Sequence, residues 1–156
     1  MATLSSDDTE SPSSIELLAG QPRESAPAMG EAAQQWQLIR LCLNTERVRI
    51  ESPEAEGFTL CRQPKDEPAL LIAELEQLIA AERKTVLFEP QEPSFELNFQ
   101  RSHHDGIKFE AWIDAGNAQT GFYRWDAAGI RFFTTCDLLR TFVEELRRDF
   151  GLAAVN

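Results

Sequence analysis

A strict two-residue alternation in the middle of the chain constrains its fold more than any other feature. Residues 94–101 (SFELNFQR) place three apolar side chains on one face and polar side chains on the other, which is the period of a half-buried strand. Residues 107–114 alternate in the same way after a turn at 102–106 that contains an Asp-Gly pair, and such a pair tolerates positive φ. The two segments therefore predict an antiparallel hairpin.

Two more strands are expected after this hairpin. Turn-forming residues at 115–117 and 126–129 delimit strand-like segments at 119–125 and 130–134. Because all the connections are short, neighbouring segments are expected to pair with one another. The region from residue 94 to residue 134 therefore predicts a four-stranded meander.

An amphipathic helix is expected to follow the meander. Apolar residues recur at helical spacing from Asp137 to Phe150, Thr134 or Thr135 can cap the helix, and Gly151 follows its end. We expect this helix to cover the apolar face of the sheet.

The preceding region has a similar order of elements. Residues 37–44 and 47–51 are expected to form paired strands, and residues 58–61 a third strand. Asp66-Glu67-Pro68 fits a helix N-terminus, and the expected buried stripe of that helix is Leu71, Leu75, Leu78 and Ile79. The order of strands and then a helix, twice over, predicts an α+β fold: an antiparallel sheet with two main helices packed on it, in two similar β-rich halves that share the sheet and are each closed by a helix.

The first 35 residues differ in composition from the rest. They contain six acidic residues against one arginine and are rich in Ser, Pro and Ala, a composition that buries little apolar area. We expect residues 1–35 to form a largely flexible acidic tail, in which the apolar residues 15–18 either add an edge strand or dock on the body. Residues 36–151 are expected to form a single α+β domain.

The cellular compartment is expected to be the cytoplasm. No segment has the pattern of a signal peptide, and no apolar run is long enough to cross a membrane. Cys42, Cys61 and Cys136 lack CxxC spacing, which favours reduced, partly buried thiols over a disulfide.

The sequence offers little support for catalysis. His103 and His104 precede Asp105 on a predicted turn, but no further residues with metal-ligand spacing accompany them. No nucleophile elbow or phosphate-binding glycine loop is present, and Glu144 and Glu145 read as a solvated helix face. We therefore expect no catalytic residue, no metal site and no cofactor.

Two segments carry a family resemblance. Residues 88–97 (FEPQEPSFEL) form an acidic, proline-stiffened turn that runs into a strand, and residues 123–135 (YRWDAAGIRFFTT) lead into the closing helix. Together these features resemble WapI-type bacterial immunity proteins over roughly residues 36–150. The resemblance implies a small cytoplasmic protein that binds and neutralises a polymorphic toxin without an enzymatic step.

The charge balance limits the classes of partner. The chain has 15 basic and 26 acidic residues, a net charge of -11, so direct nucleic-acid binding is not expected. An acidic surface steers instead toward a basic protein partner, such as a toxin domain. Two other classes remain open: an acidic, DNA-mimicking inhibitor or adaptor of a defence or DNA-processing complex, and an enzyme without a recognisable motif.

The candidate partner-binding residues are acidic or aromatic. Strand alternation puts Trp112 on the face opposite Ile107 and Phe109, where it either anchors a partner or is covered by another segment as part of the core. The full candidate set is Glu89, Glu92, Glu110, Trp112, Asp114, Tyr123 and Trp125. Three other aromatic residues are expected to be core residues, namely Phe122, Phe132 and Phe133.

Overall fold

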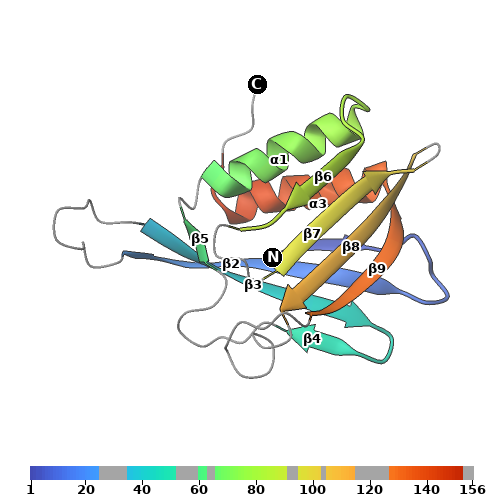
Figure 1. Cartoon of the computed structure of the whole chain (residues 1–156), viewed down its shortest axis with the longest axis horizontal. Helices are drawn as coiled ribbons and strands as arrows, with labels where there is room; N and C mark the ends of the chain where they lie inside the picture. The colour runs from blue at the N-terminus through green and yellow to red at the C-terminus, as the bar shows by residue number, and fades with distance from the viewer. Residues whose placement is uncertain are drawn as a thin grey trace.

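The chain forms two antiparallel sheets and two helices within the residues that its structure describes (Figure 1). The strands of each sheet are followed along the chain by one helix, so the expected α+β class and the two β-rich halves, each closed by a helix, are confirmed. The structure is a computed structural model, and it describes residues 1–24, 35–51, 60–62, 66–90, 95–102, 105–114 and 127–152.

The first sheet is built around two long strands. It contains β1 (Ala2–Ser5), β2 (Ser13–Glu24), β3 (Gln35–Thr45), β4 (Arg49–Glu51) and β5 (Leu60–Arg62). β2 lies between β1 and β3, while β4 and β5 pair with different parts of β3. The three strands expected in this region are present with shifted ends.

The expectation of a flexible N-terminal tail is wrong for residues 1–24. β1 and β2 pair with Ala2 opposite Leu17, and these side chains are 0% and 1% exposed. β1 alternates apolar and polar residues, and β2 does so only over residues 14–17. The hydroxyl and acidic side chains between the apolar ones make the segment polar as a whole and obscure the pattern. Residues 15–18 thus belong to an interior strand, and residues 25–34 lie outside the described ranges.

The second sheet is a meander of four strands. These are β6 (Thr85–Phe88), β7 (Phe95–Arg101), β8 (Gly106–Asp114) and β9 (Ala127–Thr135). The expected hairpin is confirmed, with Phe99 opposite Phe109. The expected strand order, with residues 119–125 between the segments 107–114 and 130–134, is wrong, because β9 pairs directly with β8. Residues 115–126 themselves lie outside the described ranges, and β6, a short apolar run in the sequence, completes the meander.

Both expected helices are present. Within the described residues they are α1 (Asp66–Ile79) and α3 (Cys136–Asp149). Thr135 is the N-cap of α3, because its hydroxyl oxygen accepts a hydrogen bond from the Leu138 amide at 3.2 Å. The hydroxyl of Thr134, the alternative candidate, instead donates to the Ser5 carbonyl oxygen at 2.7 Å. Neither helix is long and apolar enough to span a membrane.

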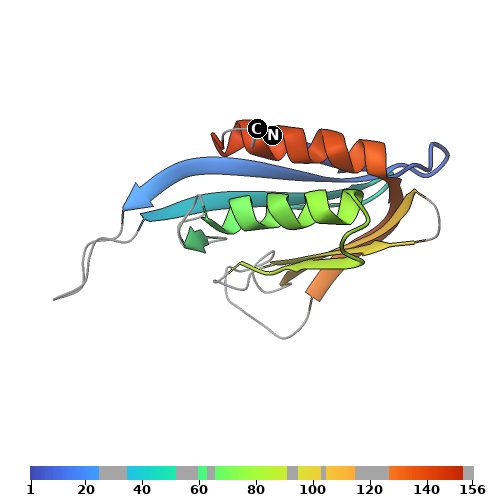
Figure 2. The ribbon, with the colours of Figure 1, turned by 90° about the horizontal axis from the view of Figure 1, so that it is seen from above.

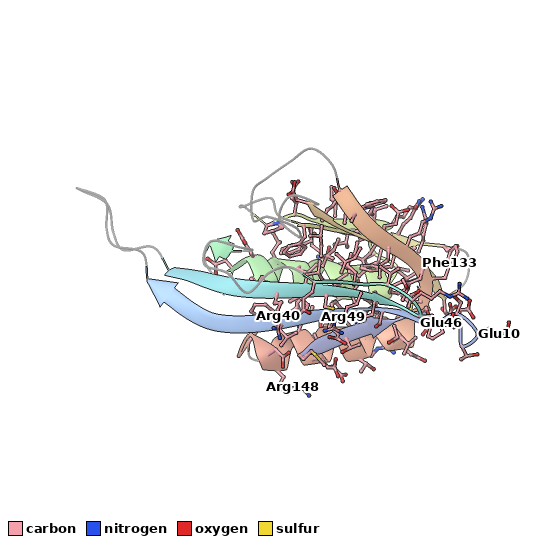
Figure 3. All side chains as sticks on the ribbon, turned by 90° about the horizontal axis from the view of Figure 1, so that it is seen from below. Glu10, Arg40, Glu46, Arg49, Phe133 and Arg148 are labelled. Carbon is pink, nitrogen blue, oxygen red and sulfur yellow. The ribbon has the colours of Figure 1, made fainter. Side chains whose placement is uncertain are left out.

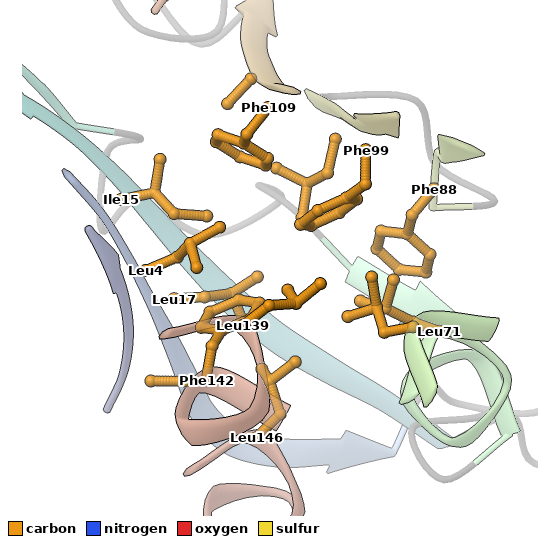
Figure 4. Packing of buried hydrophobic residues seen from close by; sticks show 14 of the residues in the cluster. Leu4, Ile15, Leu17, Leu71, Phe88, Phe99, Phe109, Leu139, Phe142 and Leu146 are labelled. Atoms are coloured by element: carbon orange, nitrogen blue, oxygen red, sulfur yellow. The ribbon is translucent and has the colours of Figure 1, made fainter. Parts of the chain in front are cut away.

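One hydrophobic core joins both sheets and both helices. Inward side chains of the first sheet (Leu4, Leu17), the second sheet (Phe99), α1 (Leu71) and α3 (Phe142) belong to one buried cluster (Figure 4). The strands of the second sheet cross β2 and β3 at a steep angle as a separate layer (Figures 1 and 2). Each half therefore has its own sheet instead of sharing one, and the second sheet keeps one face toward solvent.

Candidate partner-binding face

The solvent-facing side of the second sheet, which we call the outer face, is set by strand alternation. Inward residues such as Phe99 and Phe109 are 0% exposed, so the residues between them point outward. The strand register aligns outward residues in rows, for example Gln100, Lys108 and Phe133. The outer face comprises Leu87, Glu96, Asn98, Gln100, Lys108, Glu110, Trp112, Arg131 and Phe133.

Three large apolar side chains are exposed on the outer face. Leu87, Trp112 and Phe133 are 58%, 39% and 56% exposed. They lie in different rows of the face, and exposed aromatic side chains are enriched at interaction surfaces. The other large exposed apolar side chains among the described residues lie outside this sheet and are Met1, Val48 and Leu70.

The position of Trp112 depends on the glycine opposite it. Gly129 faces Trp112 across the β8–β9 pair, and a Cβ atom built on Gly129 would lie 2.5 Å from Trp112 Cε3 and 2.3 Å from the Ala111 carbonyl oxygen. The indole therefore packs directly on the glycine backbone, an approach that any side chain at this position would block. No described element covers the remaining surface of the ring.

Phe133 is not a core residue, contrary to the expectation from the sequence. Phe132 packs against the core, whereas Phe133 is exposed, because adjacent residues of a strand point to opposite faces. The sequence did contain a usable signal. Arg131 has the same parity as Phe133, so its charge marks that side of the strand as the solvent side. Phe122 lies outside the described ranges.

The acidic candidates occupy different environments. Glu110 pairs with Lys108, with 2.7 Å between Oε1 and Nζ. Asp114 is only 8% exposed, so its expected place on the solvent-facing side is wrong; burial alternation stops at the end of β8, where two successive residues are buried. Glu89 is exposed directly after β6. The remaining candidates lie outside the described ranges and are Glu92, Tyr123 and Trp125.

A hollow of about 510 Å³ lies at one end of the outer face. Two of the basic side chains that line it already have partners. Lys108 pairs with Glu110, and Arg101 Nη1 donates to the carbonyl oxygens of Leu78 and Ile79 at 2.8 Å and 3.1 Å. Arg101 therefore caps the C-terminus of α1, a role that the sequence does not reveal because the helix end is far away along the chain. The hollow is lined by Lys84, Gln100, Arg101, Ser102, Lys108 and Phe133.

Acidic side chains gather beside Phe133. The loop between β1 and β2 contains three acidic residues, and its Asp7 amide donates to the Phe133 carbonyl oxygen at 3.0 Å. The β3–β4 turn, which carries Glu46, is adjacent to this loop because β2 and β3 pair up to their ends. Figure 3 shows Glu10, Glu46 and Phe133 at the same end of the molecule.

The first sheet carries a buried thiol on the side away from the core. Cys42 is 1% exposed, and its thiol donates to Asn44 Oδ1 at 3.3 Å. Burial raises the pKa of the Cys42 thiol, and the positive charge of Arg49 opposes this only in part. The thiol is therefore protonated at neutral pH and is a poor nucleophile.

The expectation of free cysteines holds where the structure describes them. Cys42 and Cys136 are both free and buried, while the side chain of Cys61 lies outside the described part of the chain. His103 and His104 also lie outside it. Among the described residues, no group of His, Cys, Asp and Glu side chains is arranged to hold a metal ion.

Comparison with known proteins does not assign the chain to a family. The sequence matches no protein-family model, and no curated protein matches it. Among solved structures, the chain is similar to that of the plant transcriptional regulator PBF-2, with a TM-score of 0.42 and 9% sequence identity, covering 96% of this chain and 79% of that one. A likeness at this TM-score decides neither fold nor function.

Proposed function

We propose that the chain is a non-enzymatic binding protein that acts as an immunity protein and neutralises a toxin domain by direct contact. The observation that carries this proposal is the pair of exposed aromatic side chains, Trp112 and Phe133, on a sheet face that no described element covers. The resemblance to WapI-type immunity proteins supplies the biological role. In that role the protein works in the cytoplasm, where the toxin would otherwise act.

The geometry of the two aromatic residues suits an anchor for a partner. Large aromatic side chains dominate the energetics of protein interfaces, and Trp112 is already held against Gly129, so binding costs it little conformational freedom. The strand register places Glu110 and Arg131 between Trp112 and Phe133. A partner that covers both rings therefore also covers a row with one charge of each sign.

The acidic residues near Phe133 favour a basic partner. Basic residues of the hollow lie beside Phe133, but so do the acidic β1–β2 loop and Glu46, and the whole chain has a net charge of -11. Such a charge steers a basic protein toward this end of the outer face. The outer face itself carries two acidic and two basic residues, Glu96, Glu110, Lys108 and Arg131, which makes it a poorer imitation of DNA than a continuous row of carboxylates.

A pull-down followed by quantitative binding tests this function. The tagged full-length chain is used to capture partners from its native host, captured proteins are identified by mass spectrometry, and the partner domain is purified for titration. We expect one stoichiometric toxin domain with a basic surface. Trp112→Ala should weaken its binding by at least about tenfold, because the main aromatic anchor is lost.

The matched control is Leu18→Ala. Leu18 lies on β2, on the face of the first sheet opposite to buried Leu17, and is partly exposed, so its truncation removes apolar surface without touching the outer face, and affinity should be unchanged. Circular dichroism of both variants establishes that they fold. Equal affinity of Trp112→Ala and the parent protein, or capture of a DNA-processing assembly in place of a toxin, would contradict the proposal.

A further inference from the structure

Among the described residues, strand β6 pairs with β7 alone and so forms an open edge of the second sheet. The sheet order is β6-β7-β8-β9, and the Arg101 amide donates to the Lys84 carbonyl oxygen at 2.9 Å. Backbone groups in an antiparallel pair alternate between facing the partner strand and facing away from it. Since Lys84 faces β7, Val86 faces it as well, and the N–H and C=O groups of Thr85 and Leu87 point away from the sheet.

A face of α1 lies beside this open edge. Glu74 pairs with Arg83, just before β6, at 2.8 Å, whereas Glu76 pairs with Arg147 of α3 at 2.7 Å. These two ion pairs turn the side of α1 that carries Glu74 toward β6, and Figure 1 shows the two elements side by side. Leu70 lies one turn before Glu74 on that same side of the helix.

Two exposed leucines flank the open edge. Leu70 is 62% exposed and Leu87 is 58% exposed, and they come from adjacent elements, α1 and β6. Apolar side chains on both sides of an unpaired strand lack the usual protection of an edge by charge, proline or a bulge. Only the residues that flank β6, Lys84 and Glu89, are charged, and they have opposite signs.

We propose that β6 pairs in antiparallel orientation with β6 of a second copy of this chain, so that the protein forms a twofold-symmetric dimer. With Thr85 opposite Leu87 of the second copy, the outward backbone groups of both strands are satisfied. In this register the basic residues that precede β6, Arg83 and Lys84, lie opposite Glu89 and Phe88 of the second copy, whereas a parallel orientation would juxtapose like charges. The α1 face that carries Leu70 lies beside the joined edge in each copy.

The dimer leaves the partner-binding face free. The two four-stranded sheets join edge to edge, so their outer faces lie side by side on one continuous surface. Trp112 and Phe133 lie on β8 and β9, away from the β6 edge. This inference does not depend on the proposed function, since it concerns another edge and another occupant.

Amide exchange and mass measurement test the dimer together. Light scattering should give the mass of two chains as the full-length protein is concentrated from about 5 µM to about 500 µM. Over that range, hydrogen exchange at the Thr85 and Leu87 amides should slow by about tenfold or more. The Val86 amide, which bonds to β7 in either state, should not change.

Two variants test whether the β6 edge forms the dimer without changing the stability of the fold. Leu87→Pro removes an N–H that the β6–β7 ladder does not use, and Leu70→Glu places a charge beside the joined edge; each should give a monomer of parental secondary structure. Leu87→Thr keeps the N–H and should retain the dimer, as should Val48→Glu on the β3–β4 turn.

Four results would overturn this proposal. The first is a single-chain mass at every concentration. The second is a dimer that both Leu87→Pro and Leu70→Glu retain. The third is full protection of the Thr85 and Leu87 amides in a one-chain species, because the edge would then be covered within the chain. The fourth is protection of these amides that arises only when a different protein is added.

Discussion

At the scale of single residues, the outer face depends most on Gly129. A Cβ atom there would meet both the Trp112 ring and, at 2.3 Å, the carbonyl oxygen of Ala111. The ring can turn aside, but a backbone carbonyl in a paired strand cannot move without disturbing the ladder. Gly129→Ala should therefore lower the free energy of unfolding by about 1–3 kcal/mol, measured by urea denaturation.

The control for this prediction is the same change in a Trp112→Ala background. Removing the indole relieves one of the two contacts, so the cost of Gly129→Ala should fall but should not vanish. If Gly129→Ala is neutral in the parent protein, β8 and β9 are not as close at this position as the structure has them.

The sequence predicted the orientation of some outer-face residues correctly and of others incorrectly, for physical reasons. Alternation placed Trp112 on the polar side of its strand correctly, because every second residue around it is apolar. It failed for Phe133, where two adjacent phenylalanines hide the period, and for Asp114, where β8 ends and burial ceases to alternate. Gly129 has significance only through the residue opposite it, and cross-strand register is not visible in one strand alone.

At the scale of elements, Arg101 links three parts of the fold. It lies at the end of β7, and its Nη1 donates to two carbonyl oxygens at the end of α1 and to the Cys136 thiol at the start of α3, at 3.6 Å. Its side chain is 21% exposed. Arg101→Met keeps the aliphatic stem but leaves part-buried carbonyl oxygens without their charged donor.

We expect Arg101→Met to lower the free energy of unfolding by about 2 kcal/mol, the usual worth of hydrogen bonds to a charged group. Arg140→Met is the matched control, because Arg140 forms an exposed ion pair with Asp137 at 2.5 Å, and its loss should cost about 0.5 kcal/mol or less. Chemical denaturation of both variants gives the comparison. Equal losses would show that Arg101 does not cap α1.

The sequence predicted the elements whose formation depends on neighbouring residues. The β7–β8 hairpin follows from alternation and a turn, and α3 follows from its apolar period with Thr135 as cap and Gly151 at its end. β6 and β9 are harder to assign, since a short apolar run and an irregular segment become strands only through pairing with β7 and β8. The separation into two sheets likewise depends on long-range packing.

At the scale of the whole molecule, the first 24 residues close the core. β1 packs against α3, where the Thr3 amide donates to Glu145 Oε2 at 2.8 Å, and β2 lies at the centre of the first sheet between β1 and β3. An acidic, serine-rich composition gave no indication of this, because composition averages over two faces of a strand that have opposite character. The inward residues Ala2, Leu4, Ile15 and Leu17 are apolar and buried.

Two adjacent leucines in β2 test whether this segment is part of the core. Leu17 is 1% exposed, whereas Leu18 points to the other face of the sheet and is partly exposed. Leu17→Ala should lower the free energy of unfolding by about 2–5 kcal/mol, as a buried leucine leaves a cavity, while Leu18→Ala should cost about 1 kcal/mol or less. Because the two variants change the same residue type one position apart, effects on the unfolded chain largely cancel. Small and equal losses in urea denaturation would mean that the N-terminal strands are not part of the core in solution, and the flexible acidic tail that the composition predicts would then be the better description.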